Sequence, residues 1–275
     1  MLGCTLAYKV TSEFSFAIFL LTAMTAISVH AAGNIVNTYF DYMRGIDSKK
    51  SDDRTLVDNL LSKDELVTLG VILYSFGCLG FFILAIITTA RLEHLALVYF
   101  GGLSSSFLYT GGIGFKYIAL GDILIIIIFG PVTVLFSYMV QTGTMHWATI
   151  LYAIPVALHT EAILHSNNTR DLENDLKAGI VTLAILIGET AAEVLYAVFL
   201  LSPYTMFIIW GLKYSSLLFI PLITIPEAFR TERYFRTVSK QHGPQRTAKL
   251  SLYVGLLYIT ACGLSDIDKL PFLRS

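Results

Sequence analysis

The stretch Asn34-Ile-Val-Asn37-Thr-Tyr-Phe-Asp41-Tyr-Met-Arg-Gly45-Ile-Asp47 decides the fold, because it places polar residues at helical spacing within an apolar segment. On a helix that turns about 100° per residue, Asn37 and Asp41 fall on one narrow face, and His30 extends that face toward the N-terminus. A polar stripe on an apolar helix must face the interior of a bundle or a wet cavity. Gly45 is expected to end the helix, which places Asp47 on the following loop.

The chain as a whole is strongly apolar. Of its 275 residues, 55% are hydrophobic and 14% are charged, and the mean hydropathy is +0.67. Soluble domains carry about 25% charged residues, so this composition indicates a membrane protein. Three scattered cysteines and no C-x-x-C pair exclude a disulfide scaffold and give no support to a structural zinc site. Nucleic-acid binding is unsupported, since the chain has no basic domain.

Eight apolar stretches are each about long enough to cross the hydrocarbon core of a bilayer. They lie at Phe14–Val36, Leu66–Ala90, Leu92–Tyr109, Gly121–Val140, Trp147–Ser166, Gly179–Leu201, Tyr204–Pro226 and Thr247–Leu264. Prolines at 131, 155 and 221 fall inside spans and are expected to kink them, as membrane helices tolerate. The sequence therefore predicts an all-α, polytopic transmembrane bundle that forms a single domain over residues 1–275.

The lysines and arginines indicate how this bundle is oriented. Most of them fall on the loops after the first, third, fifth and seventh spans, which the positive-inside rule places in the cytosol. The basic run Arg230–Lys249 is interpreted as an anchor at the membrane surface. At the N-terminus, Met1–Tyr8 is too short to span and is expected to be the tail of a span. A signal peptide ending near Ala31 is the alternative, but the apolar run continues past that point.

A second polar stretch, Asn167-Asn-Thr-Arg170-Asp171-Leu-Glu-Asn-Asp175, follows the fifth span. Asn167, Asp171 and Asp175 recur every four residues and share one face if the helix continues. Four spans separate this cluster from the first. Because four is an even number, both clusters emerge on the same side of the membrane and can meet across a cavity.

Carboxylates gathered in this way repel one another unless a cation lies between them. Oxygen-only ligands suit Mg²⁺, which commonly takes one or two carboxylates together with substrate phosphate oxygens. The two clusters therefore predict a Mg²⁺–diphosphate clamp, with Lys116 and Arg54 as donors to phosphate.

Each feature also has a simpler interpretation. A single Asn-x-x-x-Asp is commonly a helix cap, Lys116 could be a positive-inside anchor, and Arg54 a solvated loop charge. Glu161 and His165, an i,i+4 pair, could satisfy each other.

At these residues the sequence resembles the UbiA-type intramembrane aromatic prenyltransferases, whose signature is two Asp-rich motifs on cytosolic loops. The matching positions are Asn37, Asp41 and Asp47 for the first motif, Asn167, Asp171 and Asp175 for the second, and Tyr109 and Lys116 on the loop between them. The spacing to Asp47 is the longer form, which is typical of menaquinone-type members. The likeness extends over nearly the whole chain and is greatest to the animal branch of the family that makes menaquinone-4.

The resemblance implies a site and a reaction. All six motif residues would bind Mg²⁺. The four motif aspartates and Lys116 would act in catalysis, and Asn37, Asn167, Tyr109, Lys116 and Arg54 would bind substrate. The expected reaction is transfer of a geranylgeranyl group from its diphosphate to reduced menadione. Members have nine spans, so this chain, with eight spans and Met1–Tyr8, is expected to lack most of the first helix.

The resemblance also implies a cellular context. The protein would reside in the bilayer of the endoplasmic reticulum and Golgi, or of mitochondria, with its active-site loops in the cytosol, and HMG-CoA reductase would be a partner. Three alternative functions stay open at this point. They are prenylation of a ubiquinone precursor or another aromatic acceptor, ion-coupled transport, and a sterol-regulatory scaffold. Acids clustered at one membrane face argue against a carrier with a midplane site.

Overall fold

The computed structural model describes residues 1–47, 53–102, 104, 107–112 and 114–273. These residues form helices and no strand; the only pairing of extended backbone among them is an isolated parallel bridge between Ile118 and Val181. The predicted all-α class is therefore confirmed. The bridge joins the loop that carries Lys116 to the segment after the second motif, since the Val181 amide donates to the Tyr117 carbonyl over 3.3 Å.

Six segments of the described chain are long and apolar enough to cross a membrane. They are α2 (Phe16–Met43), α3 (Lys63–Ile87), the continuous run Gly121–Thr142, α8 (Ala148–Arg170), α11 (Glu189–Lys213) and α13 (Gly243–Leu264). The bundle is polytopic as predicted, but the count of eight spans is not confirmed.

The expected span Leu92–Tyr109 is not one helix. It divides into α4 (Leu92–Gly101) and the single turn α5 (Phe107–Thr110). The Gly101–Gly102 pair explains where α4 ends, because Gly102 adopts φ −108° and ψ −84°, outside the helical region. With a rise of 1.5 Å per residue, α4 covers about 15 Å, roughly half of the hydrocarbon thickness.

The predicted boundary between the sixth and seventh spans is also wrong. The sixth was expected to begin at Gly179, but that region holds two short helices, α9 (Leu172–Lys177) and α10 (Leu183–Ile187). Helix α11 begins after Gly188, whose φ is +79°, and continues through the buried Pro203 to Lys213. A membrane helix tolerates such an internal proline. The chain then returns through the 3₁₀ segment η4 (Ser216–Thr224) and α12 (Ile225–Thr237).

Pro131 distorts its helix as the sequence predicts. The run Gly121–Thr142 consists of α6 (Gly121–Ile127), a π-helical turn at Ile128–Val132 called η3, and α7 (Thr133–Thr142). The Thr133 hydroxyl donates to the Ile128 carbonyl over 2.7 Å and so supplies a donor to a backbone group within the distorted turn. Gly130, in the same turn, lies against Ala157 of α8, where a Cβ atom would come within 2.4 Å of the Ala157 Cβ.

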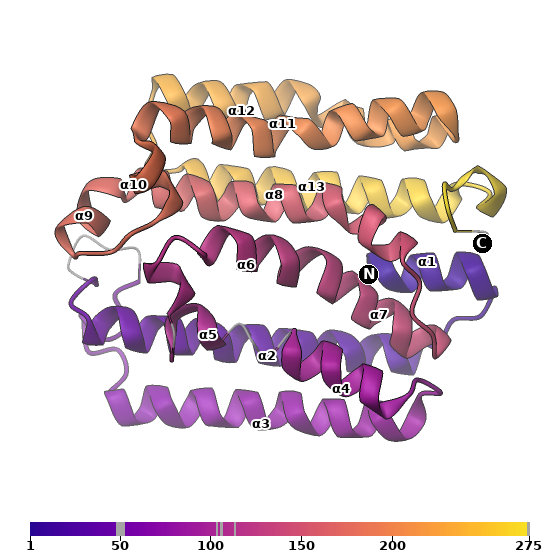
Figure 1. Cartoon of the computed structure of the whole chain (residues 1–275), viewed down its shortest axis with the longest axis horizontal. Coiled ribbons are helices and arrows are strands. Elements are labelled where there is room, and N and C mark those ends of the chain that lie inside the picture. The colour runs from indigo at the N-terminus through magenta and orange to yellow at the C-terminus, as the bar shows by residue number, and fades with distance from the viewer. Residues whose placement is uncertain (48–52, 103, 105–106, 113, 274–275) are drawn as a thin grey trace.

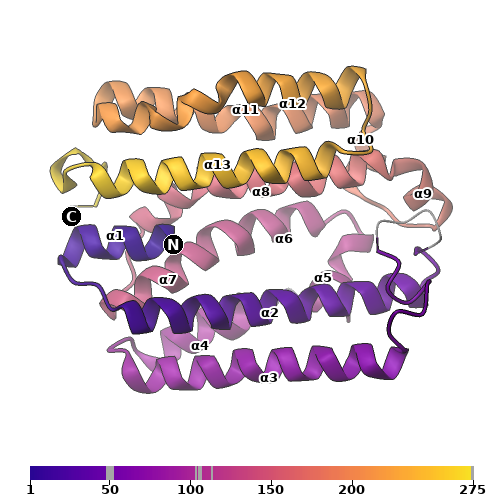
Figure 2. The same ribbon diagram turned by 180° about the vertical axis from the view of Figure 1, so that it is seen from behind.

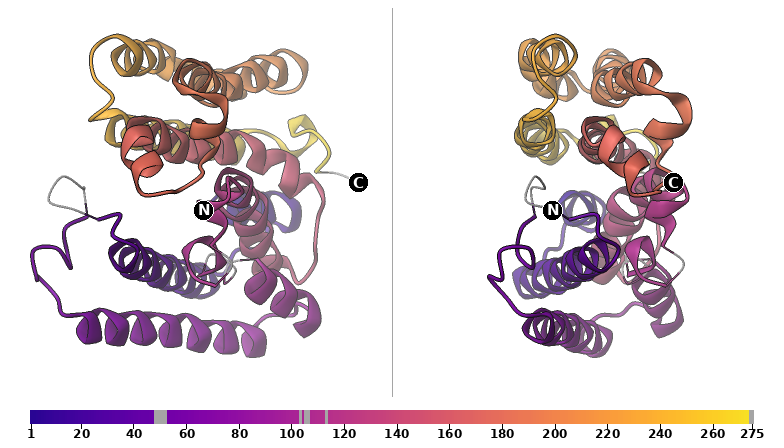
Figure 3. Two further views of the ribbon diagram at one scale, coloured as in Figure 1. Left: turned by 60° about the vertical axis from the view of Figure 1, so that its left-hand side comes forward. Right: turned by 90° about the vertical axis from the view of Figure 1, so that its left-hand side faces the viewer.

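The long helices run side by side in successive layers (Figures 1 and 2). Helix α3 lies at one edge beside α2, the α6–α7 run and the short α1 (Leu2–Thr11) follow, then α8 with α13, and finally α11 with α12. The side views show the same helices from the end of the bundle that carries α9 and α10 (Figure 3). Because α2 and α8 lie on either side of the α6–α7 run, their polar faces can line a shared space.

Candidate active site

Both polar stretches lie at the same end of the bundle, where α2 ends and α8 passes into α9 (Figure 1). Gly45, with φ +72°, follows the end of α2 as predicted and leaves Asp47 on the loop. At the other motif the helical bonding continues across the junction. The Asp171 amide donates to the Asn167 carbonyl over 3.0 Å, and the Asp175 amide to the Asp171 carbonyl over 2.9 Å.

Asp41 is the buried centre of the first motif, with 5% of its surface exposed. Its carboxylate accepts from the Lys116 ammonium over 2.6 Å and from the Tyr117 hydroxyl over 2.9 Å. The same ammonium lies 3.4 Å from the Asn37 amide oxygen. The short 3₁₀ segment η2 (Phe115–Tyr117) carries both donors, and the Arg44 guanidinium stacks on the Tyr117 ring at 3.8 Å. Lys116 is thus held inside the site rather than on a membrane-facing surface.

Arg170 organises the second motif in a similar way. Its guanidinium donates to both carboxylate oxygens of Asp171, over 2.8 and 2.6 Å, and to the Asn167 amide oxygen over 2.8 Å. Such bidentate pairing fixes the orientation of a carboxylate as well as neutralising it. From the sequence, Arg170 is assigned no role in the site. Its position directly before Asp171 was the available signal, but adjacent residues on a helix do not usually face each other.

Asp47 and Asp175 have no ion pair within the described residues, and the pKa of each carboxyl is raised. Burial raises the pKa of Asp175 to about 6, with further raising by Asp171 and Asp41 and a lowering contribution from Lys116. Burial also raises the pKa of Asp47 to about 6, again with Asp41 raising and Lys116 lowering it. Because Asp41 and Lys116 act on both carboxyls, the two motifs share one electrostatic environment.

The loop after the first motif is tied back to α2 through Asp53. The Thr38 hydroxyl and the Thr55 amide donate to this carboxylate over 2.5 and 2.9 Å. Burial alone would raise the pKa of Asp53, but these hydrogen bonds outweigh it and lower the pKa. The neighbouring Arg54 pairs with Asp58 over 2.7 Å on a half-exposed surface and does not contact the cavity described next.

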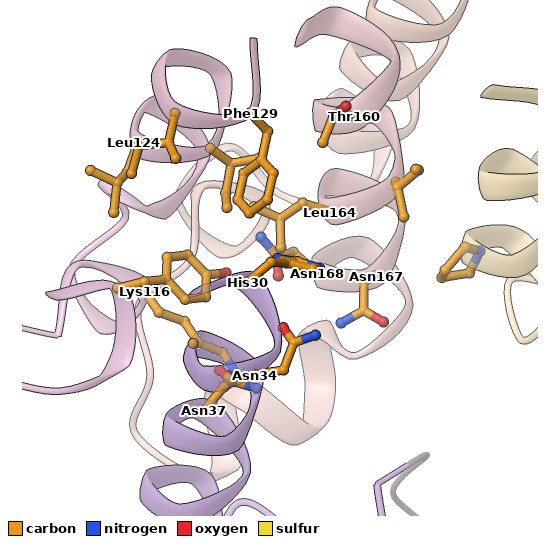
Figure 4. A pocket seen from close by; sticks show the side chains of 16 residues that line it. His30, Asn34, Asn37, Lys116, Leu124, Phe129, Thr160, Leu164, Asn167 and Asn168 are labelled. Carbon is orange, nitrogen blue, oxygen red and sulfur yellow. Dashed lines mark hydrogen bonds between the residues drawn. The ribbon is translucent and has the colours of Figure 1, made fainter. Parts of the chain in front are cut away.

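A cavity of about 450 Å³ lies between the two motifs (Figure 4). In Figure 4, Asn34, Asn37 and Lys116 approach it from one side and Asn167 from the other, while Leu124, Phe129 and Thr160 lie at its far end. Its lining consists of His30, Gly33, Asn34, Asn37, Tyr109, Lys116, Leu124, Ile125, Ile128, Phe129, Thr160, Ile163, Leu164, Asn167, Asn168 and Pro244. The predicted polar stripe of α2 therefore faces a cavity, and the cavity has one polar end and an apolar remainder.

The arrangement of two Asn/Asp motifs around one membrane cavity agrees with a comparison at family level. A profile of the UbiA prenyltransferase family matches residues 1–262. The chain belongs to the UbiA prenyltransferase family. It is accordingly an aromatic prenyltransferase embedded in a membrane, and family membership favours an enzyme over an ion-coupled transporter.

Curated relatives are similar over most of the UbiA chain. The UbiA prenyltransferase domain-containing protein 1 homolog of Drosophila melanogaster is 62% identical over 265 residues, which cover 95% of this chain and 74% of the relative. UbiA prenyltransferase domain-containing protein 1 of Gallus gallus is 53% identical over 99% of this chain and 82% of its own length. The protein of that name from Homo sapiens is 52% identical over 98% of this chain and 80% of its own length.

Solved structures share the fold at low sequence identity. A UbiA homolog from Aeropyrum pernix K1, in its apo form, superposes with a TM-score of 0.71 at 15% identity and covers 94% of this chain and 96% of its own. A digeranylgeranylglyceryl phosphate synthase has a TM-score of 0.54 at 20% identity, with 96% and 91% coverage. These likenesses confirm the helical UbiA fold.

The UbiA chain also holds a buried acidic cluster that the sequence did not reveal. Asp122, Glu161 and His165 are at most 3% exposed and present ligand atoms within 4.8 Å of one another. His165 Nδ1 lies 3.0 Å from Asp122 Oδ1, and Nε2 lies 3.1 Å from the Ala192 carbonyl oxygen. Glu161 has no hydrogen-bond donor among the described residues. Glu161 and His165 therefore do not satisfy each other. Asp122 was missed because an acid in the first turn of a span resembles an ordinary helix-terminal residue.

The donor sets separate the two acidic groups chemically. The Asn/Asp motifs offer only oxygen ligands beside a cavity, which suits Mg²⁺ together with a diphosphate. The buried cluster mixes an imidazole with carboxylates, a set that suits transition metals at least as well. Lining does not separate the two groups, because only Asn37 and Asn167 of the six motif residues line the cavity. By donor chemistry, the oxygen-only set of the two motifs is the better match to Mg²⁺.

Proposed function

We propose that this UbiA enzyme transfers a geranylgeranyl group from its diphosphate to reduced menadione, in a Mg²⁺-dependent reaction that forms menaquinone-4. The observation that carries the proposal is the cavity with one polar end, at which Asn37, Asn167 and Lys116 meet, and an apolar remainder. The longer spacing between Asp41 and Asp47 supports the menaquinone type. Prenylation of a ubiquinone precursor is the competing reaction in the same class.

The polar end would receive the diphosphate. Mg²⁺ would be held by Asn37, Asp41, Asp47, Asn167, Asp171 and Asp175. When bound, this ion supplies positive charge that stabilises the departing diphosphate. Lys116, 2.6 Å from Asp41, is placed to donate a charge-assisted hydrogen bond to a phosphate oxygen. Arg54, whose exposed side chain pairs with Asp58 away from the cavity lining, is not included among the phosphate donors.

The apolar remainder would protect the reaction from water. Breaking the allylic C–O bond leaves the electron pair on the diphosphate and a positive charge on the prenyl chain, which water would quench. Leu124, Ile128 and Phe129 form a wall without a competing nucleophile. Tyr109 lines the same cavity and would contact the substrate near the reacting carbon. The ring carbon of the quinol then forms the new C–C bond, and its proton passes to the released diphosphate or to a motif carboxylate, which restores the aromatic ring.

The cellular context completes the proposal. The loops carrying the motifs would face the cytosol, in agreement with their basic residues. The membrane would be that of the endoplasmic reticulum and Golgi, or of mitochondria, and HMG-CoA reductase would be a partner by resemblance alone. Residues 1–275 would form a single UbiA-like membrane domain.

The decisive experiment offers membranes containing the protein a choice of substrates. Reduced menadione and a 4-hydroxybenzoate-type ubiquinone precursor are supplied together with prenyl diphosphates of several lengths, with Mg²⁺ or with EDTA. We expect menaquinone-4 by mass spectrometry with Mg²⁺ and none with EDTA. A product on the benzoate ring alone would refute the menadione assignment. Product formation that persists in EDTA would refute the magnesium clamp.

A further inference from the structure

A second cavity, of about 280 Å³, lies between α8 and α13 and adjoins the main one. The two cavities share Thr160 and Ile163 in their linings. The second cavity is mostly apolar, with Phe207, Tyr258 and several aliphatic residues around it. Its distinctive polar residue is His159, which no step of the proposed mechanism uses.

The hydrogen bonds around His159 favour one of its two neutral tautomers. Nδ1 lies 3.3 Å from the Ser251 hydroxyl oxygen, and that hydroxyl lies 2.8 Å from the Thr247 carbonyl oxygen. The same hydroxyl lies 3.4 Å from the His159 carbonyl oxygen. Both carbonyls can only accept, so we assign the single hydroxyl hydrogen of Ser251 to the nearer one, that of Thr247. Ser251 therefore accepts from Nδ1–H of His159. In the neutral imidazole, Nε2 then carries a lone pair.

That lone pair has no partner in the described part of the chain. His159 is 3% exposed, lines the second cavity, and its Nε2 lacks any hydrogen-bond donor there. An unpaired buried polar atom destabilises a structure unless a ligand or water pairs with it. An apolar prenyl chain in this cavity would leave Nε2 unpaired. A ligand with a hydroxyl group would satisfy it.

We propose that the second cavity binds the aromatic acceptor, and that Nε2 of His159 accepts a hydrogen bond from a ring hydroxyl of its hydroquinone form. This inference rests on the proposed function and names the acceptor side of the same site. An oxidised quinone has only acceptor oxygens. Its carbonyl oxygen would face the lone pair of His159 Nε2 without a hydrogen between them, so no hydrogen bond would form. His159 thus selects the reduced form, whose electron-rich ring is the form that can attack the allylic carbon.

The position of His159 along α8 agrees with this role. It precedes Asn167 by a rise of about 12 Å along the helix axis. A hydrogen bond of about 2.8 Å to the hydroxyl and an approach of about 3–3.5 Å between reacting carbons take up roughly half of that length. The remaining length accommodates part of an aromatic ring and the first prenyl carbon beside the diphosphate site.

The first test measures binding without turnover. Binding of menadiol, kept reduced, and of menadione is measured for the detergent-solubilised protein without prenyl diphosphate. We expect the wild-type protein to prefer menadiol by about tenfold, the effect of one buried hydrogen bond. His159→Asn, which retains a polar group only near the Nδ1 position, should bind both forms equally. His159→Gln, whose side-chain oxygen can reach the Nε2 position, should restore the preference. Equal binding of the two forms by the wild-type protein would overturn the inference, whether or not the enzyme is active.

The second test uses turnover and the two monomethyl ethers of menadiol. In the wild-type enzyme, the ether that blocks the recognised hydroxyl should lose about tenfold in kcat/KM. In His159→Asn that ether and menadiol should react equally, whereas a purely steric loss would persist in the variant. The KM for geranylgeranyl diphosphate should stay within twofold. An active wild-type enzyme with unchanged kinetics in His159→Asn contradicts this inference alone. Absence of product from every acceptor contradicts the proposed function instead.

Discussion

Replacing Lys116 by Met keeps the aliphatic stem but removes the ammonium that contacts Asp41. The side chains of Lys116 and Asp41 are 16% and 7% exposed, and their charged atoms lie 2.6 Å apart. At an effective dielectric constant near 20, two unit charges at that separation attract by about 6 kcal/mol before desolvation is considered. Removing one partner of a buried pair costs about 3–5 kcal/mol. The Tyr117 hydroxyl still donates to Asp41, so we expect a loss of about 2–3 kcal/mol in unfolding free energy.

The same change should lower activity by a free energy similar to the loss of stability. Without the ammonium, the diphosphate loses a charge-assisted hydrogen bond of about 1.5–3 kcal/mol, which corresponds to a 10- to 150-fold loss of kcat/KM for prenyl diphosphate. The KM for the acceptor should change little. Lys177→Met is the matched control, because that side chain is 74% exposed and lies 3.8 Å from Glu173. Unchanged diphosphate kinetics in Lys116→Met, with folding intact, would reduce Lys116 to a structural anchor.

Two further substitutions test the site, and a pair of glycine substitutions tests the helix packing. Asp171→Asn should abolish Mg²⁺-dependent product formation while the melting temperature in detergent shifts by only a few degrees; wild-type turnover would contradict a role in binding magnesium. Arg54→Ala should change kcat/KM by less than threefold, because its exposed ion pair contributes little; a loss above tenfold would show that this side chain reaches the diphosphate. Gly130→Val should destabilise the protein by about 1–3 kcal/mol or more through overlap with Ala157, whereas Gly255→Ala, with no atom within 4 Å, should be neutral in the same thermal denaturation assay.

The polar stripe on α2 was predictable because its chemistry conflicts with its surroundings. Polar residues at helical spacing in an apolar span are expected to face a cavity, and His30, Asn34 and Asn37 do line one. Gly45 likewise ends α2 through a left-handed conformation that favours glycine. In both cases a local rule and the global fold agree, so the sequence alone is sufficient.

The helix boundaries and the buried partners were less predictable, for physical reasons. Apolar composition does not distinguish a helix that continues through Pro203 from one that stops before it, since burial decides the outcome. The Gly101–Gly102 pair breaks a span that hydropathy alone would continue. The contact between Asp122 and His165 joins residues 43 positions apart, and no periodic pattern in either helix reports it.

The charge balance of the site gives the strongest argument for a divalent cation. Each motif pairs one carboxylate with a resident cation, Asp41 with Lys116 and Asp171 with Arg170. The second carboxylate of each motif, the one whose pKa burial raises to about 6, has no such ion pair within the described chain. Two unpaired carboxylates, one from each half of the chain, match the charge of one divalent ion. Such an ion would therefore couple the two motifs energetically.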